Sequence, residues 1–199
     1  MDIKNEICKA IGAAIAITMG VWCLLVVGTP LGAFLFALGL LTVCYFKLNL
    51  FTGMCGYVID NRQIGKLLLT LFVNICAGYI FGLFIGQSDE AVKAAALVKV
   101  STWNCDFSFY LRSIACGMIM FIAVDMFKES KSPLGIIFGI PLFILTGFQH
   151  SIANVITMGI AETWHWSIII CIIGNWIGSI VMWVMKGQVF AYLDKTIKK

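Results

Sequence analysis

Charged residues are scarce in this chain. Only 12% of its 199 residues are Asp, Glu, Lys or Arg, whereas 61% are hydrophobic, and the mean hydropathy is +0.98. Soluble globular domains carry a charged fraction of about 25%. The scarcity of charge therefore excludes a water-soluble protein, and we expect an integral membrane protein.

Histidine is almost absent, with two residues in the whole chain. The sequence contains no histidine cluster, no HExxH motif and no nucleophile with a convincing partner, so we expect no enzyme, no metal and no cofactor. Eight cysteines lie mostly inside apolar segments, without the spacing of a zinc site or of a disulfide framework. We interpret them as small, reduced hydrophobic residues.

Long polar stretches are also missing, so no room remains for a soluble domain. Apolar stretches long enough to cross a bilayer, at about 20 residues each, lie near residues 7–28, 31–51, 67–86, 107–127, 134–160 and 167–186. They predict six helical spans with short connections in one transmembrane domain, 1–199. The first span follows MDIKNEICK and lacks a small-residue cleavage site, so we expect it to be retained rather than removed as a signal peptide.

The positive charges are distributed unevenly between the two sides of the predicted membrane domain. With six spans both chain ends share one side, and most lysines and arginines fall on it. Four lie elsewhere: Lys47, Lys93, Lys99 and Arg112. The positive-inside rule then places both termini in the cytoplasm and the protein in the cell (inner) membrane. The net charge of +4 reflects this topology, and we expect no nucleic-acid partner.

The middle span of each half is interrupted by glycine and polar residues, in CYFKLNLFTGMCGYVIDNR and in LTGFQHSIANVITMG. Because three spans per half is an odd number, the halves, approximately 1–86 and 107–186, would cross in opposite senses as inverted repeats. Unpaired backbone at a helix break is tolerated only where it faces protein or a water-filled cavity. Breaks beside Gly53 and Gly147, in helices 2 and 5, therefore predict a transport pathway.

With these stretches in view, the sequence resembles the formate/nitrite transporter family. NLFTG and GFQHSIAN match the two half signatures of the family, and IIGNWIGS and IACGMIMFIAVDM follow its sixth and fourth spans. The resemblance covers essentially the whole chain. It implies an aquaporin-like arrangement of six helices, of which the second and fifth are broken, and a homopentamer in which each protomer encloses its own pore.

The resemblance also implies which residues line that pore. The cytoplasmic constriction would be formed by Leu40, Leu50, Phe51 and Met120, and the outer one by Phe36 and Phe143. A chamber between them would hold His150 and Thr52, with Asn175 matching a family asparagine in the last span. Lys99 is the candidate for a family lysine that attracts anions on the outer side. Without the resemblance, the two phenylalanines would be interpreted as packing residues.

Histidine chemistry suits a weak-acid anion in such a pore. A bare carboxylate in an apolar slit costs tens of kcal/mol on an idealised estimate, whereas the neutral acid costs only a few. A histidine, with a reference pKa of about 6.5, carries and releases a proton near neutral pH. We therefore expect His150 to supply or relay a proton while Thr52 and Asn175 orient the ring or the substrate. The partners would be small monovalent anions, protons and the lipid bilayer.

Several residues depart from the family pattern around this chamber. Gln149 and Asn49 stand where relatives usually have acids, and Gly117 replaces a common asparagine. Any mechanism that needs a carboxylate beside His150 is therefore in question. The departures leave open which anion is carried, among formate, nitrite, hydrosulfide, acetate and lactate.

Two charged residues are also unusual for their positions. Lys47 lies inside the first break, where it would either snorkel towards an interface or add positive potential to the pore. Asp125 replaces a tryptophan near the cytoplasmic end of the fourth span, and we expect it to reach Lys128 or Lys131.

Three other functions remain open on the sequence alone. A channel for a neutral solute such as water, ammonia or hydrogen sulfide would have a similar helical arrangement. A membrane enzyme that uses His150 with a cysteine or carboxylate lacks a recognisable motif. A structural or assembly protein would have little reason to place Thr52, His150 and Asn175 in apolar segments.

Overall fold

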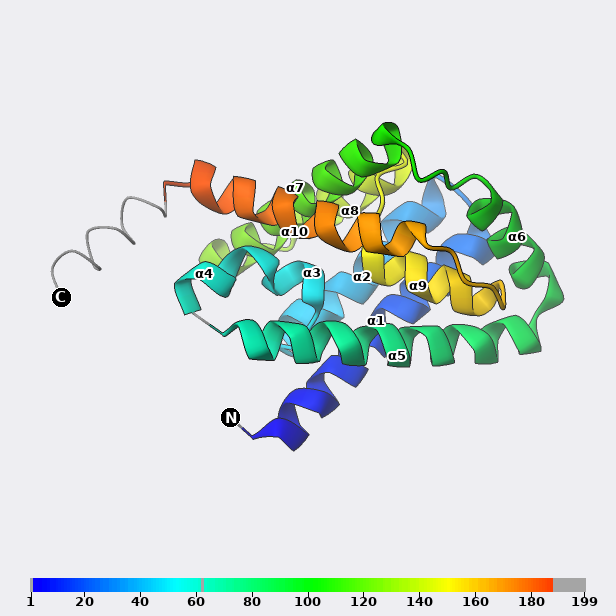
Figure 1. Ribbon diagram of the computed structural model, residues 1–199, viewed down its shortest axis with the longest axis horizontal. Helices are drawn as coiled ribbons and strands as arrows, with labels where there is room; N and C mark the ends of the chain where they lie inside the picture. Colours follow the sequence, from blue (N-terminus) through cyan, green and yellow to red (C-terminus); the bar gives the residue numbers. More distant parts are fainter. Residues whose placement is uncertain (1, 62, 188–199) are drawn as a thin grey trace, which may run out of the picture.

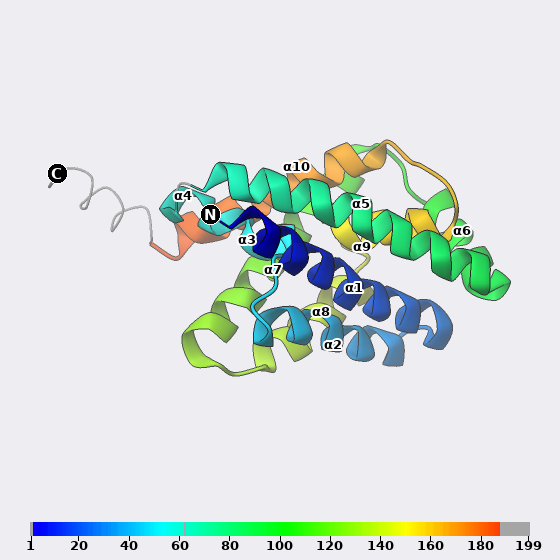
Figure 2. The ribbon, with the colours of Figure 1, turned by 90° about the horizontal axis from the view of Figure 1, so that it is seen from below.

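The computed structural model is a bundle of α-helices that describes residues 2–61 and 63–187 (Figures 1 and 2). Within these ranges there is no β-strand. Four described helices are long and apolar enough to cross a membrane: α1 (Ile3–Val27), α5 (Ile64–Ser88), α7 (Phe107–Ser130) and α10 (Ser167–Met185). Large apolar side chains on their outer faces are exposed, among them Phe72 at 67% and Met19 at 62%. Soluble proteins rarely expose so much apolar surface to water, so the bundle is a multi-pass membrane protein, as the composition predicts.

The remaining helices are too short to cross a bilayer alone. α2 (Leu31–Tyr45) is followed by non-helical residues 46–50 and then by α3 (Phe51–Met54), the 3-10 helix η1 (Cys55–Tyr57) and α4 (Val58–Asn61). In the second half, α8 (Leu134–Leu145) is followed by non-helical residues 146–150 and by α9 (Ser151–Ile160). These two non-helical segments, which we call the first and second turn segments, lie inside the stretches that carry the family signatures.

Helix α6 (Glu90–Ser101) lies where a short connection was predicted. Its first turn is capped by Asp89, whose side chain accepts the backbone N–H groups of Ala91 and Val92 at 3.0 and 3.1 Å. Such a cap typically stabilises a helix by about 1 kcal/mol. The helix packs on α9 and places Lys99 in its last turn, where a cation suits the helix dipole.

The helices pack most extensively where α10 meets α7 and where α5 meets α9. Gly117 of α7 lies against the backbone of Asn175, and a Cβ at position 117 would overlap the Asn175 carbonyl oxygen. The asparagine common in relatives at this position could not fit this packing. The departure from the family pattern thus allows α7 and α10 to approach closely.

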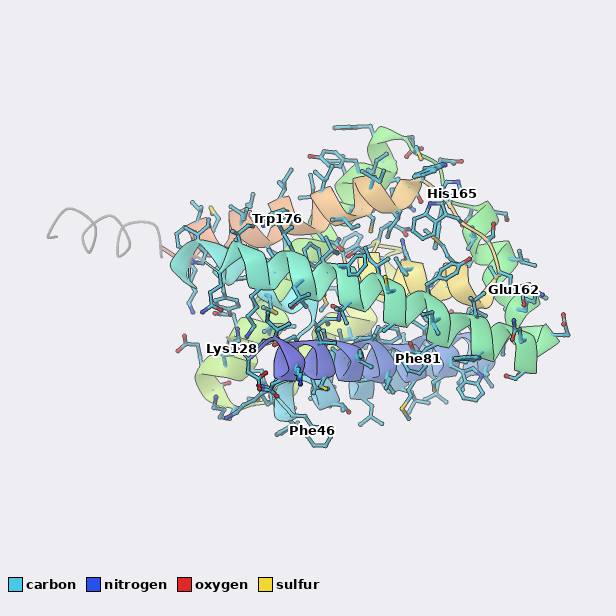
Figure 3. All side chains as sticks on the ribbon, turned by 60° about the horizontal axis from the view of Figure 1, so that its bottom comes forward. Phe46, Phe81, Lys128, Glu162, His165 and Trp176 are labelled. Atoms are coloured by element: carbon cyan, nitrogen blue, oxygen red, sulfur yellow. The ribbon has the colours of Figure 1, made fainter. Side chains whose placement is uncertain are left out.

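The bundle has two distinct ends. The N-terminus and the last turn of α10 lie at one end, which we call the terminal end, and α6 lies at the other, the α6 end (Figure 1). Figure 3 shows Phe46 and Lys128 towards the terminal end and Glu162 and His165 towards the α6 end.

The ion pairs of the structure lie near these two ends. At the α6 end, Lys93 pairs with Glu162 at 2.8 Å. At the terminal end, Asp125 pairs with Lys186 at 2.7 Å. The expectation that Asp125 reaches Lys128 or Lys131 is therefore wrong, because the end of α10 brings a distant lysine closer.

Candidate functional site

The two turn segments share one hydrogen-bonded turn. In each, the amide of a left-handed residue bonds the carbonyl three residues earlier, and the next amide bonds the carbonyl five residues earlier. The distances are 3.3 and 2.9 Å around Lys47, and 3.1 and 2.9 Å around Gly147. This is the Schellman motif that ends many helices. Both residues have positive φ, 54° for Lys47 and 71° for Gly147, so Lys47 rather than Gly53 occupies the left-handed position of the first turn segment.

Asn175 of α10 clamps the second turn segment. Its Oδ1 accepts the backbone N–H of Ser151 at 2.8 Å, and its Nδ2 donates to the carbonyls of Gln149 and Ser113, both at 2.8 Å. These bonds satisfy the backbone on both sides of His150 and tie it to α7. Asn175 therefore acts on His150 through the neighbouring peptide groups.

Asn74 of α5 clamps the first turn segment in the same way. Its Oδ1 accepts the N–H of Phe51 at 2.9 Å, and its Nδ2 donates to the carbonyls of Asn49 at 3.2 Å and Ala10 at 2.8 Å. It thus holds the peptide groups on both sides of Leu50, as the α10 asparagine does for His150. Two clamps of one design fix the two turn segments.

Asn74 did not emerge from the sequence, although a signal was present. It lies 23 residues after Phe51, and Asn175 lies 24 residues after Ser151. A single asparagine in an apolar span, at nearly equal distance behind each signature, is the sequence signal that the two clamps share.

Thr52 and His150 meet at the centre of the bundle. The Thr52 Oγ1 and His150 Nε2 atoms are 2.9 Å apart, and the two residues are 1% and 2% exposed. His150 Nδ1 accepts the backbone N–H of Ala153 at 3.1 Å and so caps α9. Because an accepting nitrogen carries no proton, the neutral ring holds its proton on Nε2 and donates it to Thr52 Oγ1. The hydroxyl hydrogen of Thr52 is then left for another acceptor.

The two phenylalanines predicted for the outer constriction lie together beside this pair. The ring of Phe143 stacks on His150 with centroids 5.7 Å apart, and Phe36 meets Phe143 edge-on at 5.9 Å. Both phenylalanines are buried. One side of the histidine is therefore covered by aromatic surface, which excludes water from the ring.

The four residues predicted for the cytoplasmic constriction belong to one buried apolar cluster. Leu40, Leu50, Phe51 and Met120 are each exposed by no more than 1%. Leu50 precedes α3 as His150 precedes α9, so an apolar side chain fills in the first turn segment the place that the histidine fills in the second. The Phe51 ring packs edge-on against Trp176 at 6.4 Å.

Lys99 is a partly buried cation in the last turn of α6. Burial lowers the pKa of the Lys99 ammonium from its usual value. Its charge is also close enough to His150 to interact with it electrostatically. A partly buried positive charge thus lies at the α6 end, within electrostatic range of His150.

Gln149 stands where relatives have an acid, and its side-chain amide forms hydrogen bonds with nearby residues. Its Oε1 accepts from Nδ2 of Asn154 at 2.9 Å, and its Nε2 donates to the Gly147 carbonyl at 3.1 Å. The amide therefore stabilises the second turn segment and supplies no proton.

Asn49 has a comparable structural use in the first turn segment. Its Nδ2 donates to the Glu6 carboxylate at 2.7 Å, and the same carboxylate pairs with Lys66 at 2.7 Å. An acidic residue at position 49 would place like charges together. The amide at this position fits the acidic neighbour on α1.

Comparison with known proteins identifies relatives of this sequence. The sequence model of a family described as Formate/nitrite transporter matches residues 1–187. A curated relative, "Uncharacterized transporter YrhG" of Bacillus subtilis (strain 168), is 26% identical over 186 residues, which cover 82% of this chain and 69% of the relative.

Two solved structures share the fold. "Pentameric formate channel with formate bound" superimposes with a TM-score of 0.75 and 17% identity, covering 98% of both chains. "FNT family ion channel" gives the same TM-score and identity, covering 100% of this chain and 91% of the other. Because the family model matches nearly the whole sequence, the chain belongs to the formate/nitrite transporter family.

Proposed function

We propose that the protein is a channel for small monovalent weak-acid anions, such as formate, nitrite or hydrosulfide, in which His150 relays a proton. The observation that carries the proposal is the buried 2.9 Å contact between Thr52 and His150. Thr52 lies in α3, directly after the first turn segment, and His150 ends the second turn segment. Intramembrane polar residues of this kind are expensive and commonly mark transport pathways. Family membership supports the same class of solute.

The proposed membrane topology has six crossings. In it, α2 to α4 form one interrupted span and α8 with α9 another, and the halves 1–86 and 107–186 are inverted repeats. The equal turns at Lys47 and Gly147, and the equal clamps from Asn74 and Asn175, support this symmetry. The terminal end would face the cytoplasm across the cell membrane, because most lysines and arginines of the sequence belong to it.

Along the proposed pathway an anion from the α6 end first meets the positive charge of Lys99. It then passes the outer constriction of Phe36 and Phe143 and reaches Thr52 and His150. The inner constriction, formed by Leu40, Leu50, Phe51 and Met120, follows. Both constrictions are apolar, so an ion that keeps its charge would have to cross them at a high desolvation cost.

The proposed proton relay uses the two hydrogen bonds of the His150 ring. A proton that arrives at Nδ1 must displace the Ala153 N–H bond and makes the ring an imidazolium. The Nε2 proton then moves to Thr52 Oγ1 as the Thr52 hydroxyl proton moves to the anion, which leaves neutral acid, neutral hydroxyl and neutral ring. The ring is then left with its proton on Nδ1. We propose that the α9 cap is released in this step and forms again when the ring returns to the tautomer with its proton on Nε2.

The same geometry favours a second candidate, a channel for a neutral solute such as water, ammonia or hydrogen sulfide. With Nδ1 occupied by the Ala153 amide, the resting centre presents a neutral ring and a neutral hydroxyl. A neutral solute would pass such a centre without any proton transfer.

Solute flux in liposomes decides between the two candidates. Purified protein is reconstituted with an internal pH dye, and formate, nitrite, hydrosulfide, acetate, lactate and chloride are added in turn, with protein-free liposomes as control. Our proposal expects one or more weak-acid anions to cross faster than through bare lipid, and chloride not to. If folded, oligomeric protein accelerates none of the anions but accelerates water or ammonia, the neutral-solute function replaces it.

A homopentamer is part of the proposal. It is supported by the likeness to a structure titled as a pentameric formate channel. Apolar side chains on α2 and α8 also remain exposed in the single chain, Leu38 at 66% and Phe138 at 64%. Neighbouring copies or lipid would cover these faces.

A further inference from the structure

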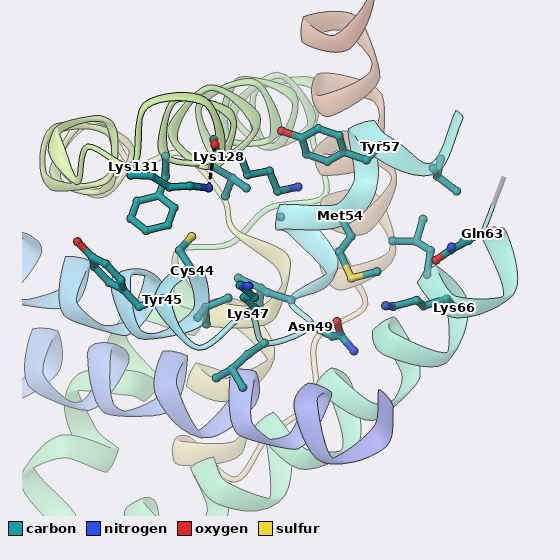
Figure 4. A pocket seen from close by; sticks show the side chains of 18 residues that line it. Cys44, Tyr45, Lys47, Asn49, Met54, Tyr57, Gln63, Lys66, Lys128 and Lys131 are labelled. Atoms are coloured by element: carbon teal, nitrogen blue, oxygen red, sulfur yellow. Dashed lines mark hydrogen bonds between the residues drawn. The ribbon is translucent and has the colours of Figure 1, made fainter. Parts of the chain in front are cut away.

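A cavity of about 630 Å³ opens at the terminal end, bounded by the first turn segment, α5 and α7 (Figure 4). Four lysines line it: Lys47, Lys66, Lys128 and Lys131. The rest of the wall combines amides, such as Asn49 and Gln63, with apolar side chains. Cavities of this size usually hold ligands much larger than a small monovalent anion.

The carboxylates around the cavity are already paired with other groups. Glu6 pairs with Lys66, and Asp125 and Glu129 both pair with Lys186, at 2.7 and 3.1 Å. Among the side chains that the structure describes, no carboxylate lies within ion-pair distance of Lys47, Lys128 or Lys131. Three positive charges of the cavity wall are therefore not neutralised by these acids.

Two of these lysines contact neutral groups, which leave their positive charges in place. The Lys128 ammonium lies 3.3 Å from the centre of the Tyr57 ring. Lys131 Nζ donates to the Lys128 carbonyl at 3.0 Å (Figure 4). Neither contact removes positive charge, so both ammonium groups remain available to an anion.

Lys47 adds its charge at a conformational cost. Its φ of 54° is left-handed, a conformation that costs an L-residue free energy and glycine almost none. The second turn segment has Gly147 at the equivalent place. A lysine in a position that suits glycine indicates a use for its charge, and the cavity is the site at which it lies.

We propose that this cavity is a binding site for a polyvalent anion of the phosphate class, held by Lys47, Lys128 and Lys131. Three uncompensated lysines match two or three negative charges better than one, and the amides and apolar wall suit a phosphate attached to an organic group. The phosphate could belong to a lipid headgroup, because basic pockets at the cytoplasmic side of membrane helices bind such headgroups. It could equally belong to a soluble compound, because lysine is a common phosphate ligand.

An occupant would also reduce conduction, a step that rests on the proposed channel function. Asn49 and Leu50 belong to the first turn segment and also line the cavity, so a bound molecule would lie at the inner mouth of the pathway. A single proton cannot neutralise a polyvalent phosphate, which would therefore stay in the cavity and exclude the transported anion.

Binding is tested on the purified full chain in neutral-lipid nanodiscs, by calorimetric titration with pyrophosphate and, at equal ionic strength, with formate. We expect pyrophosphate to bind at least about tenfold more tightly than formate. Lys47→Gly, which suits the backbone, and the pair Lys128→Gln and Lys131→Gln should each weaken pyrophosphate binding about tenfold. Lys4→Gln removes the same charge from an exposed lysine at the same end, outside the cavity, and should leave binding unchanged.

The lipid source is tested by thermal unfolding in nanodiscs with and without phosphatidylglycerol. A stabilisation by this lipid that disappears in the cavity variants but not in Lys4→Gln assigns the phosphate to a lipid. Pyrophosphate binding in neutral nanodiscs assigns it to a soluble compound. If neither effect occurs, or if the cavity variants and Lys4→Gln behave alike, the proposed site does not exist. These binding results stand whether or not the protein conducts formate, so failure of the site is distinguishable from failure of the channel.

Discussion

At the scale of single residues, His150 has two uses, because one ring nitrogen caps α9 and the other meets Thr52. Thr52→Val keeps the shape of the side chain but leaves the Nε2 proton without a partner. An unsatisfied buried donor costs about 1–3 kcal/mol, which corresponds to about 5- to 150-fold in rate if the hydroxyl contacts the passing anion.

We therefore expect Thr52→Val to reduce formate flux in liposomes about fivefold or more, while Thr52→Ser retains most of it. Size-exclusion profiles of the two variants check that the assembly is intact. Equal flux in Thr52→Val and wild type would show that this hydroxyl does not serve the transported anion.

Lys99 gives a prediction about alkaline pH. Burial lowers the pKa of its ammonium, so the group loses its charge at a lower pH than an exposed lysine does. The charge attracts anions below this pKa and is lost as the pH rises through it. Anion uptake from the α6 end should therefore fall at alkaline pH in wild type, measured as initial rates at low salt.

Lys99→Met should reduce uptake at neutral pH and remove this alkaline decrease. Lys93→Met is the matched control, because Lys93 lies on the same helix but pairs with Glu162 at the surface. If both variants lower uptake equally, the effect is general surface charge and Lys99 has no special place in the pathway.

At the scale of elements, the two turn segments depend on their asparagine clamps. Asn74→Ala and Asn175→Ala each leave one backbone N–H and two carbonyls without their partner inside the bundle. Each unsatisfied buried group costs about 1–3 kcal/mol, so both variants should unfold at clearly lower temperature in detergent. Asn5→Ala, on an exposed position of α1, should leave the transition unchanged. A wild-type transition in either clamp variant would mean that the turn segments are held by other contacts.

The elements also show what hydropathy and motifs predict well. The four long helices follow directly from apolar runs of bilayer length. The turn segments lie in the two signature stretches, which interrupt apolar runs with glycine and polar residues. Helix α6 was missed because its sequence is not uniformly apolar and its start depends on one capping residue, Asp89. A single capping residue is a weaker signal for predicting a helix from sequence than a long apolar run is.

Contacts between distant elements were the hardest to predict. The placement of Thr52 beside His150 was expected only from the family resemblance, since nothing in the spacing joins residues in different halves. Asp125 was assigned to nearby lysines, whereas the fold brings Lys186 from the end of α10. Asn74 was overlooked because a single asparagine in an apolar span shows its purpose only when the backbone beside it is known.

At the scale of the whole molecule, charge, polarity and apolar surface are separated. Ion pairs and lysines gather near the two ends, large apolar side chains cover the outside, and the Thr52 and His150 pair lies buried between. A neutral small acid can cross such a molecule far more easily than its anion can. The proposed function therefore depends on one proton delivered at the centre.

That dependence is tested most directly by recording formate influx and internal pH together, for wild type and His150→Asn, over about pH 5 to 8, the range in which histidine titrates. Asparagine preserves a side-chain cap for α9 but cannot relay a proton. We expect wild-type influx to rise as the external pH falls, with about one proton per formate, and His150→Asn to lose this pH dependence after subtraction of protein-free liposomes. The same pH profile and proton yield in both proteins would contradict the proposal that His150 carries the proton.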